Sequence, residues 1–166
     1  MRGALFLNTP PKQVIVNRIQ QGIAIIATAI AIHLLLSTLP DTLILPLFCR
    51  TPATVAAWWF HVPLDSHTLT YTVNGITFEM ARSCSAENFF AIATALLLWR
   101  APKWCWGALP LTLILNSLRA ILTATLTLAC RGWRFEGLVH LTAGATLFIG
   151  TLYLLWILTE RHPHGH

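Results

Sequence analysis

The sequence predicts an all-α polytopic membrane protein with about four transmembrane helices, an outer interfacial helix, and a β-hairpin before the second span. Of its 166 residues, 55% are hydrophobic and only 10% are charged, and the mean hydropathy is +0.64. So few charged residues cannot solvate a globule of this size, so the chain must contact lipid. The second observation that predicts this fold is a series of long apolar segments, each long enough to be a candidate membrane span. We treat residues 1–166 as a single membrane-embedded domain.

The first span is predicted at residues 19–39, which carry no formal charge. At about 1.5 Å of rise per residue, a helix of this length covers about 30 Å, the hydrocarbon thickness of a bilayer. A polar, basic leader precedes it, and the apolar run is too long for the core of a cleaved signal peptide. We therefore expect this helix to be retained.

Residues 40–83 are predicted to form an outer loop. Prolines and an arginine interrupt its apolar part, so no spanning helix fits there, and Trp58-Trp59-Phe60 is typical of an interfacial helix. Alternating β-branched residues flank Asn74-Gly75, which is the strongest short signal for a β-hairpin. Because a bare hairpin cannot lie in lipid, it must stand in water or pack on the protein. It leads directly to Cys84.

Three further spans are predicted at residues 84–101, 106–130 and 137–158. The first of these is short unless it begins near Ser83 and Arg100 extends its side chain toward the interface. Tryptophans lie near the ends of the spans, as aromatic belts require.

The charges predict the topology. With both termini in the cytoplasm, six basic residues lie inside and four outside, and five of the six acidic residues lie outside. The charges therefore favour a topology with the long loop on the outer side of the membrane. Although the net charge is +5, the basic residues are scattered beside apolar segments, which argues against nucleic acid as a partner.

Arg119 lies near the middle of the third predicted span. An arginine there costs roughly 2.5–3.5 kcal/mol on insertion scales, so it should face protein or water and have a use. Steps of four, three, four and four place a polar stripe on one helical face: Thr112, Asn116, Arg119, Thr123 and Thr127. Hydrogen bonding between helices is enough to explain the threonines and is an alternative for Asn116. For Arg119 it is the less favoured alternative, because an arginine in a span is costly.

Cys84 and His140 open the second and fourth predicted spans on the outer side, where the long side chain of Arg119 can reach them. A thiolate is a nucleophile, and an imidazole can favour its formation and later protonate a leaving amine. A guanidinium can steady the thiolate or stabilise an oxyanion. These residues predict acyl transfer through a thioester without a metal or cofactor. Residues expected to support them are Glu87, Asn88 and Asn116, with Asn88 on the helical face of the cysteine.

At these residues the sequence resembles the exosortase/archaeosortase family of membrane-embedded cysteine transpeptidases. The resemblance covers roughly residues 67–158. It rests on a β-like stretch leading into Cys84-Ser85, on Asn116-Ser117-Leu118-Arg119 in the next span, and on His140 opening the last. The chain resembles the compact members sometimes called exosortase K. It differs from many members in having Cys84-Ser85-Ala86 in place of Cys-Ser-Gly, and about half as many spans.

The resemblance implies that Cys84 is the nucleophile, His140 an acid or base, and Arg119 a partner of the substrate or oxyanion. It also implies a class of substrate: exported proteins that end in a short motif, a hydrophobic helix and a basic tail. Such a protein would be cleaved at the motif, on the outer side of a bacterial-type inner membrane. Its acyl group would pass to an acceptor that the sequence does not identify.

Two other classes of function stay open at the level of sequence. A haem-binding redox bundle would use His33 and His140 as axial ligands and would show a Soret band. A noncatalytic membrane subunit would pair Arg119 with a carboxylate of a partner and would be indifferent to loss of Cys84. Neither explains why a hairpin, a cysteine and an intramembrane arginine occur in this order. Cys49 and Cys130 both lie on the predicted outer side, where a disulfide is chemically permitted, although separate thiols are the simpler expectation.

Overall fold

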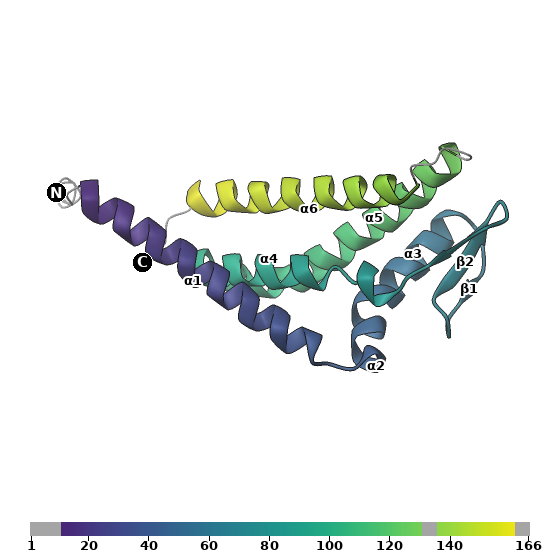
Figure 1. Cartoon of the computed structure of the whole chain (residues 1–166), viewed down its shortest axis with the longest axis horizontal. Helices are drawn as coiled ribbons and strands as arrows, with labels where there is room; N and C mark the ends of the chain where they lie inside the picture. Colours follow the sequence, from purple (N-terminus) through teal and green to yellow (C-terminus); the bar gives the residue numbers. More distant parts are fainter. Residues whose placement is uncertain (1–10, 131–135, 162–166) are drawn as a thin grey trace.

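The computed structural model describes residues 11–130 and 136–161, with side chains placed from 15 to 130 and from 142 to 160. The chain is predominantly helical, and its long helices run between two ends of the molecule (Figure 1). The helices are α1 (Pro11–Ser37), α2 (Asp41–Ile44), the π-helix η1 (Leu45–Arg50), α3 (Thr51–Trp59), the 3₁₀ turn η2 (Arg82–Cys84), α4 (Glu87–Arg100), the 3₁₀ segment η3 (Pro102–Gly107), α5 (Ala108–Ala129) and α6 (Glu136–Arg161).

Three helical segments among the described residues are long and apolar enough to cross a membrane: Ile15–Ser37, Pro102–Ala129 and Thr142–Glu160. They belong to α1, to η3 with α5, and to α6, so three of the four predicted spans are confirmed as candidates. The fourth predicted span, at 84–101, is represented by α4, which has only 14 residues. A helix of this length covers about 21 Å, which is less than the hydrocarbon core of a bilayer.

The backbone explains why α4 is short. Ala86, which precedes it, adopts a left-handed conformation with φ of 57°, so the helix cannot extend backward to Cys84. At the other end, Ala101 is pushed out of the helical region by the proline that follows it. The prediction that this helix begins at Cys84 is therefore wrong, and the cysteine lies in the separate turn η2.

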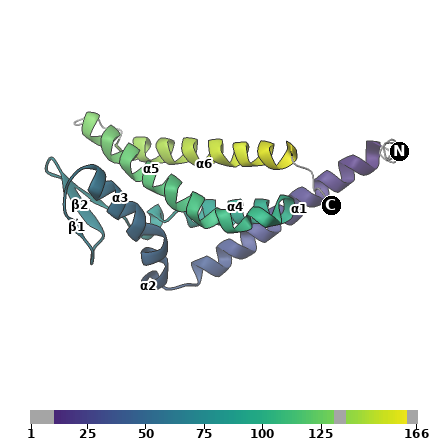
Figure 2. The ribbon, with the colours of Figure 1, turned by 180° about the vertical axis from the view of Figure 1, so that it is seen from behind.

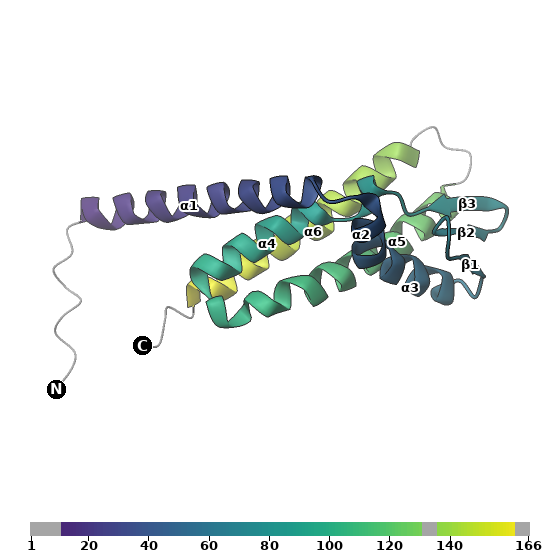
Figure 3. The same cartoon turned by 90° about the horizontal axis from the view of Figure 1, so that it is seen from below.

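Helix α4 nevertheless forms the centre of the bundle and packs against α1, α5 and α6 (Figures 1 and 3). Its small side chains allow these close approaches, and Ala91, Ala93 and Ala95 are each at most 1% exposed. Being covered by its neighbours, α4 does not need the full length of a lipid-facing span.

The predicted hairpin is confirmed and belongs to a three-stranded antiparallel sheet, in the order β1 (Leu64–Asp65), β2 (Thr70–Val73), β3 (Ile76–Glu79). Asn74 and Gly75 have φ of 51° and 80°, as a type I′ turn requires. The short strand β1 was not predicted. One face of the sheet packs toward α3, and α3 lies along α5 on the side seen in Figure 2.

We call the end of the bundle that holds this sheet and η2 the cysteine end, and the end where α1 begins and α6 finishes the terminal end. At the cysteine end, α3 exposes Trp58 and Trp59, at 73% and 57% of their surfaces, which agrees with the interfacial helix predicted there. A core cluster beneath them joins α3, the sheet, η2 and α5, and it includes Tyr71 and Cys84.

Candidate functional site

The segment at residues 81–87, called here the Cys84 loop, connects β3 with α4. Its tight turn is held by hydrogen bonds from the Cys84 N–H to the Ala81 carbonyl, 2.8 Å, and from the Ser85 N–H to the Arg82 carbonyl, 2.9 Å. Cys84 is 8% exposed and Ser85 is 1% exposed. The chain therefore leaves the sheet, turns once, and enters the central helix with the cysteine buried at the junction.

Two polar side chains of α5 hold the backbone of this loop. Asn116 Nδ2 donates to the carbonyl oxygen of Cys84 at 2.9 Å and to that of Phe48 at 3.1 Å. Arg119 Nη2 donates to the same Cys84 carbonyl at 2.9 Å. Asn116 is fully buried and Arg119 is 7% exposed. Because these donors lie 32 and 35 residues away in the chain, the contacts bring η1, η2 and α5 to one point.

The structure places the Arg119 guanidinium against the Cys84 residue, and the contact is with its main chain. The guanidinium donates to a main-chain carbonyl of the cysteine residue, and its Nε is buried without a hydrogen-bond partner among the described residues. A buried, unpaired guanidinium N–H is costly unless a ligand satisfies it. The polar stripe also faces inward, since Thr112 and Thr127 are buried.

Helix α6 contacts the site at Gly144, where the Arg119 side chain packs against the helix. A Cβ added at Gly144 would lie 3.1 Å from Cδ of Arg119, so the arginine side chain passes directly over this position. One turn further along α6, the Phe148 ring lies 5.6 Å from the guanidinium carbon. The predicted catalytic residue His140 lies in α6 one turn before Gly144, but its side chain is outside the described residues.

Arg82 is a site residue that the sequence analysis missed. Its guanidinium donates to the carbonyls of Leu36 and Leu39 at the end of α1, both at 3.0 Å. It also pairs with Asp41 at 2.8 Å and Glu87 at 3.5 Å. The pairing with Asp41 is the main cause of a raised pKa for Arg82. The signal available in the sequence was its position, two residues before the cysteine.

Cys49 was considered only as a partner of Cys130, yet it packs beside the Cys84 loop. Both residues carry unpaired thiols in the structure, so no disulfide joins them. The Cys49 thiol donates to the Ala81 carbonyl at 3.6 Å. Burial, and secondarily the neighbouring Cys84, raises the pKa of the Cys49 thiol to about 12. At neutral pH it stays protonated and is a poor nucleophile.

The other predicted residues lie in different surroundings. Glu87 is half-buried beside Arg82 and has one carboxylate oxygen without a partner among the described residues. The side chain of Asn88 is exposed, because α4 begins after Cys84 and the two residues do not share a helical face. His33 is half-buried in α1, and no hydrogen bond links it to Cys84 or Arg119 among the described contacts.

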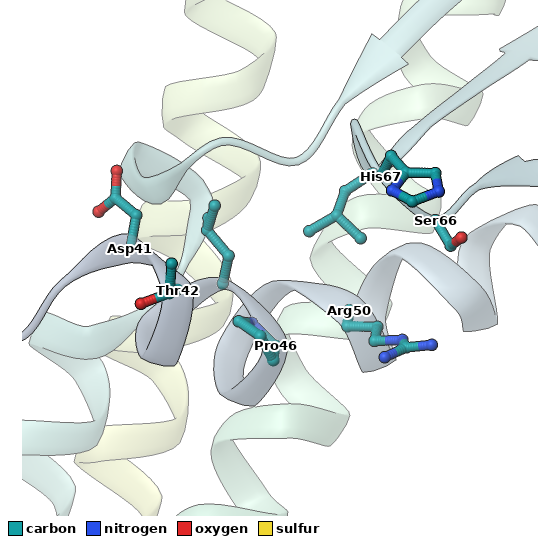
Figure 4. Close-up of a pocket in the computed structure, with 8 residues that line it drawn as sticks. Asp41, Thr42, Pro46, Arg50, Ser66 and His67 are labelled. Carbon is teal, nitrogen blue, oxygen red and sulfur yellow. The ribbon is translucent and has the colours of Figure 1, made fainter.

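A groove of about 270 Å³ opens on the surface near the Cys84 loop (Figure 4). Its lining comes from the start of α2, from η1, and from the turn before β2: Asp41, Thr42, Leu45, Pro46, Arg50, Ser66, His67 and Leu69. Asp41 is also the partner of Arg82, and Leu69 belongs to the same core cluster as Cys84. The groove is therefore adjacent to the residues that hold the cysteine.

Comparisons with protein-family models, with curated proteins and with solved structures found no match for this chain. The described residues contain no group of three or more His, Cys, Asp or Glu side chains that could hold a metal ion. The chemistry must therefore be argued from the arrangement itself: a buried thiol on a tight turn, with a guanidinium and an amide fixed on its backbone.

Proposed function

We propose that the chain is a membrane-embedded cysteine protease or transpeptidase, similar to the exosortase/archaeosortase family, with Cys84 as its nucleophile. The observation that carries the proposal is the hydrogen bond from Arg119, a buried arginine in a candidate span, to the Cys84 carbonyl. A charge placed among apolar helices is costly and needs a use. Holding the turn that presents a nucleophile is such a use.

In the proposed reaction, the Cys84 thiolate attacks the scissile carbonyl carbon, and the carbonyl oxygen becomes an oxyanion. The C–N bond then breaks, the leaving amine takes a proton from the His140 imidazolium, and a thioester to Cys84 remains. Water or an acceptor nucleophile attacks the thioester and gives its proton to the imidazole, and the thiolate is released. The role of His140 rests on the family resemblance.

Arg119 supports this reaction in two ways. Its Nη2 fixes the Cys84 backbone, and its buried Nε is a donor that a substrate oxyanion could satisfy. Cys49 is a weak alternative nucleophile because its thiol is protonated at neutral pH. The substrates proposed are exported proteins with a C-terminal motif, hydrophobic helix and basic tail, cleaved on the outer side of a bacterial-type inner membrane.

The proposal is tested by co-expressing the chain with a reporter, an exported soluble domain fused to a tripartite tail from a protein encoded near the chain's own gene. Cys84→Ala should abolish cleavage of the reporter, because no other group in the loop can form the thioester. Cys105→Ala, in η3 at the far end of α4, is the matched control and should cleave normally. Equal cleavage by Cys84→Ala and the parent would show that the mechanism is wrong and would favour a noncatalytic subunit.

A further inference from the structure

The strand that leads into the Cys84 loop lies at the edge of its sheet. The strand order is β1-β2-β3, so among the described residues β3 pairs only with β2. Figure 3 shows β1 nearest α3 and β3 on the opposite side of the sheet, running from the hairpin turn back toward α4. An edge strand presents a row of backbone N–H and C=O groups to which another extended chain can pair.

The register identifies which groups face outward. Met80 N–H donates to the Leu69 carbonyl, and in an antiparallel ladder the residues at every second position share that inward direction. Ile76 and Phe78 therefore pair inward with β2, while the N–H and C=O groups of Thr77 and Glu79 point to the free edge. No described hydrogen bond uses the outward groups of these two residues.

The burial of the side chains also indicates that a further strand could pair with β3. On the face that packs into the protein, the β2 residues Tyr71 and Val73 are 3% and 7% exposed. Their β3 partners Phe78 and Ile76 are only half-buried. The apolar face therefore continues past the last strand, where an apolar side chain of an added strand would complete it.

Resting on the proposed function, we infer that the substrate motif binds as a fourth strand on the free edge of β3. The order of the proposed tail sets its direction. The motif comes from the exported domain and is followed by the membrane helix, so its chain runs toward the bilayer, as β3 does on its way to Cys84. The added strand is therefore parallel to β3 and brings the scissile carbonyl to the thiol. Main-chain pairing supplies affinity here, and the half-covered apolar face supplies selectivity.

The first test removes outward N–H groups without removing a backbone hydrogen bond of the hairpin. Thr77→Pro and Glu79→Pro each delete a donor that β2 does not use, and an edge strand tolerates proline there. We expect each to raise the KM for the reporter about three- to tenfold, as expected for one lost hydrogen bond, with little change in kcat. Thr72→Ala is the matched control. It removes the side-chain hydrogen bond to Thr77 from the central strand and should leave KM unchanged.

A second test does not depend on catalysis or on the proline variants folding. In a Cys84→Ala background, Thr77→Cys and Glu79→Cys are each oxidised with copper-phenanthroline against reporters that carry single cysteines along the motif. We expect disulfides at tail positions two residues apart, with the position for Glu79→Cys nearer the membrane helix. This two-residue shift in the same direction is the signature of a parallel strand.

Several results would overturn the inference. These are an unchanged KM in both proline variants, an equal loss in Thr77→Ala, crosslinks without a two-residue shift, or crosslinks that shift in the opposite direction. A parent that cleaves no reporter while the crosslinks keep their pattern would refute the proposed function and leave strand pairing standing. If cleavage required Cys84 but no crosslink formed, strand pairing would be refuted and the proposed function would stand.

Discussion

The two ends of the helix bundle are held together by different kinds of contact. At the cysteine end, side chains of Cys49, Asn116 and Arg119 donate to main-chain carbonyls of the Cys84 loop. Arg82 of the loop donates in turn to the carbonyls of Leu36 and Leu39 at the end of α1. At the terminal end, polar contacts are scattered between pairs of helices. Arg100 stacks 3.6 Å over the Trp156 ring, Trp99 donates to Thr28 at 2.8 Å, and Arg18 meets Glu160 at 3.7 Å.

The hollows of the molecule differ in the same way. The groove at the cysteine end combines charged and polar side chains, including Asp41, Arg50 and His67, with the apolar residues Leu45, Pro46 and Leu69. A larger hollow of about 420 Å³ at the terminal end is lined mostly by apolar residues of α4, η3, α5 and α6. Buried polar contacts are costly to build in an apolar protein, so their concentration on one loop marks the part that needs fixed geometry. If the proposed function is right, we expect the terminal end to serve as scaffold, and the following variants test this distinction.

Arg119→Lys should have the largest effect, because an ammonium lacks the planar fork that donates to the Cys84 carbonyl while leaving Nε for a substrate. We expect the initial rate of reporter cleavage in membranes to fall about 100-fold, the loss typical of an oxyanion donor. Full activity would remove the specific role of the guanidinium and leave only its charge.

Asn116→Leu should come next. It leaves the Phe48 and Cys84 carbonyls each with one donor fewer in a buried place, which costs about 1–3 kcal/mol of stability. We expect a lower Tm in detergent. We also expect about tenfold slower cleavage, because a similar free energy is lost in holding the Cys84 loop in position. Thr112→Val is the matched control, because this buried hydroxyl donates only within its own helix, to Ala108. If both variants lowered the Tm and the cleavage rate equally, the hydrogen bonds from Asn116 to Phe48 and Cys84 would have no specific role.

Arg82→Gln should have an intermediate effect. It breaks the link from the end of α1 to the Cys84 loop, but its side chain is 29% exposed and its partner Asp41 is 60% exposed, so water screens the pair. We expect cleavage to slow several-fold. Combined with Asp41→Asn, the loss should be less than the sum of the two single losses, and strict additivity would show that the pair does not act together.

Arg100→Gln should have the smallest effect on cleavage. It removes the stacking of a half-buried guanidinium on the Trp156 ring at the terminal end, which is worth about 0.5–2 kcal/mol. The Tm should fall while the cleavage rate stays within about twofold, as expected for a change far from the site. A loss comparable to that of Arg119→Lys would contradict the division between a functional end and a scaffold.

Much of this fold could be predicted from the sequence because the relevant signals are local. Hydropathy located α1, α5 and α6, and Asn74-Gly75 located the hairpin. The spacing of polar residues along α5 predicted that one helical face, including Asn116 and Arg119, turns inward. These features depend on length, periodicity and turn chemistry, which a short stretch of chain carries by itself.

Other features could not be predicted locally. Nothing about an alanine signals a left-handed conformation, yet Ala86 adopts one, and this separates Cys84 from the helix that it was expected to begin. The attachment of Arg82 to the end of α1 and the position of Cys49 beside the loop depend on contacts between residues more than thirty positions apart. Such contacts have no periodic signature in the sequence.

The sequence by itself determined that this is an apolar, multi-helix chain with an arginine that must face inward. The tertiary structure decided what that arginine does, because only the packing of η1, η2 and α5 around α4 brings its donor to the Cys84 carbonyl. The physical reason is that hydrogen bonds are directional, whereas hydrophobic burial is not. Hydrophobic burial sets which face of a helix turns inward, whereas a hydrogen bond requires two groups to meet at one distance and angle, and the folded chain alone fixes both.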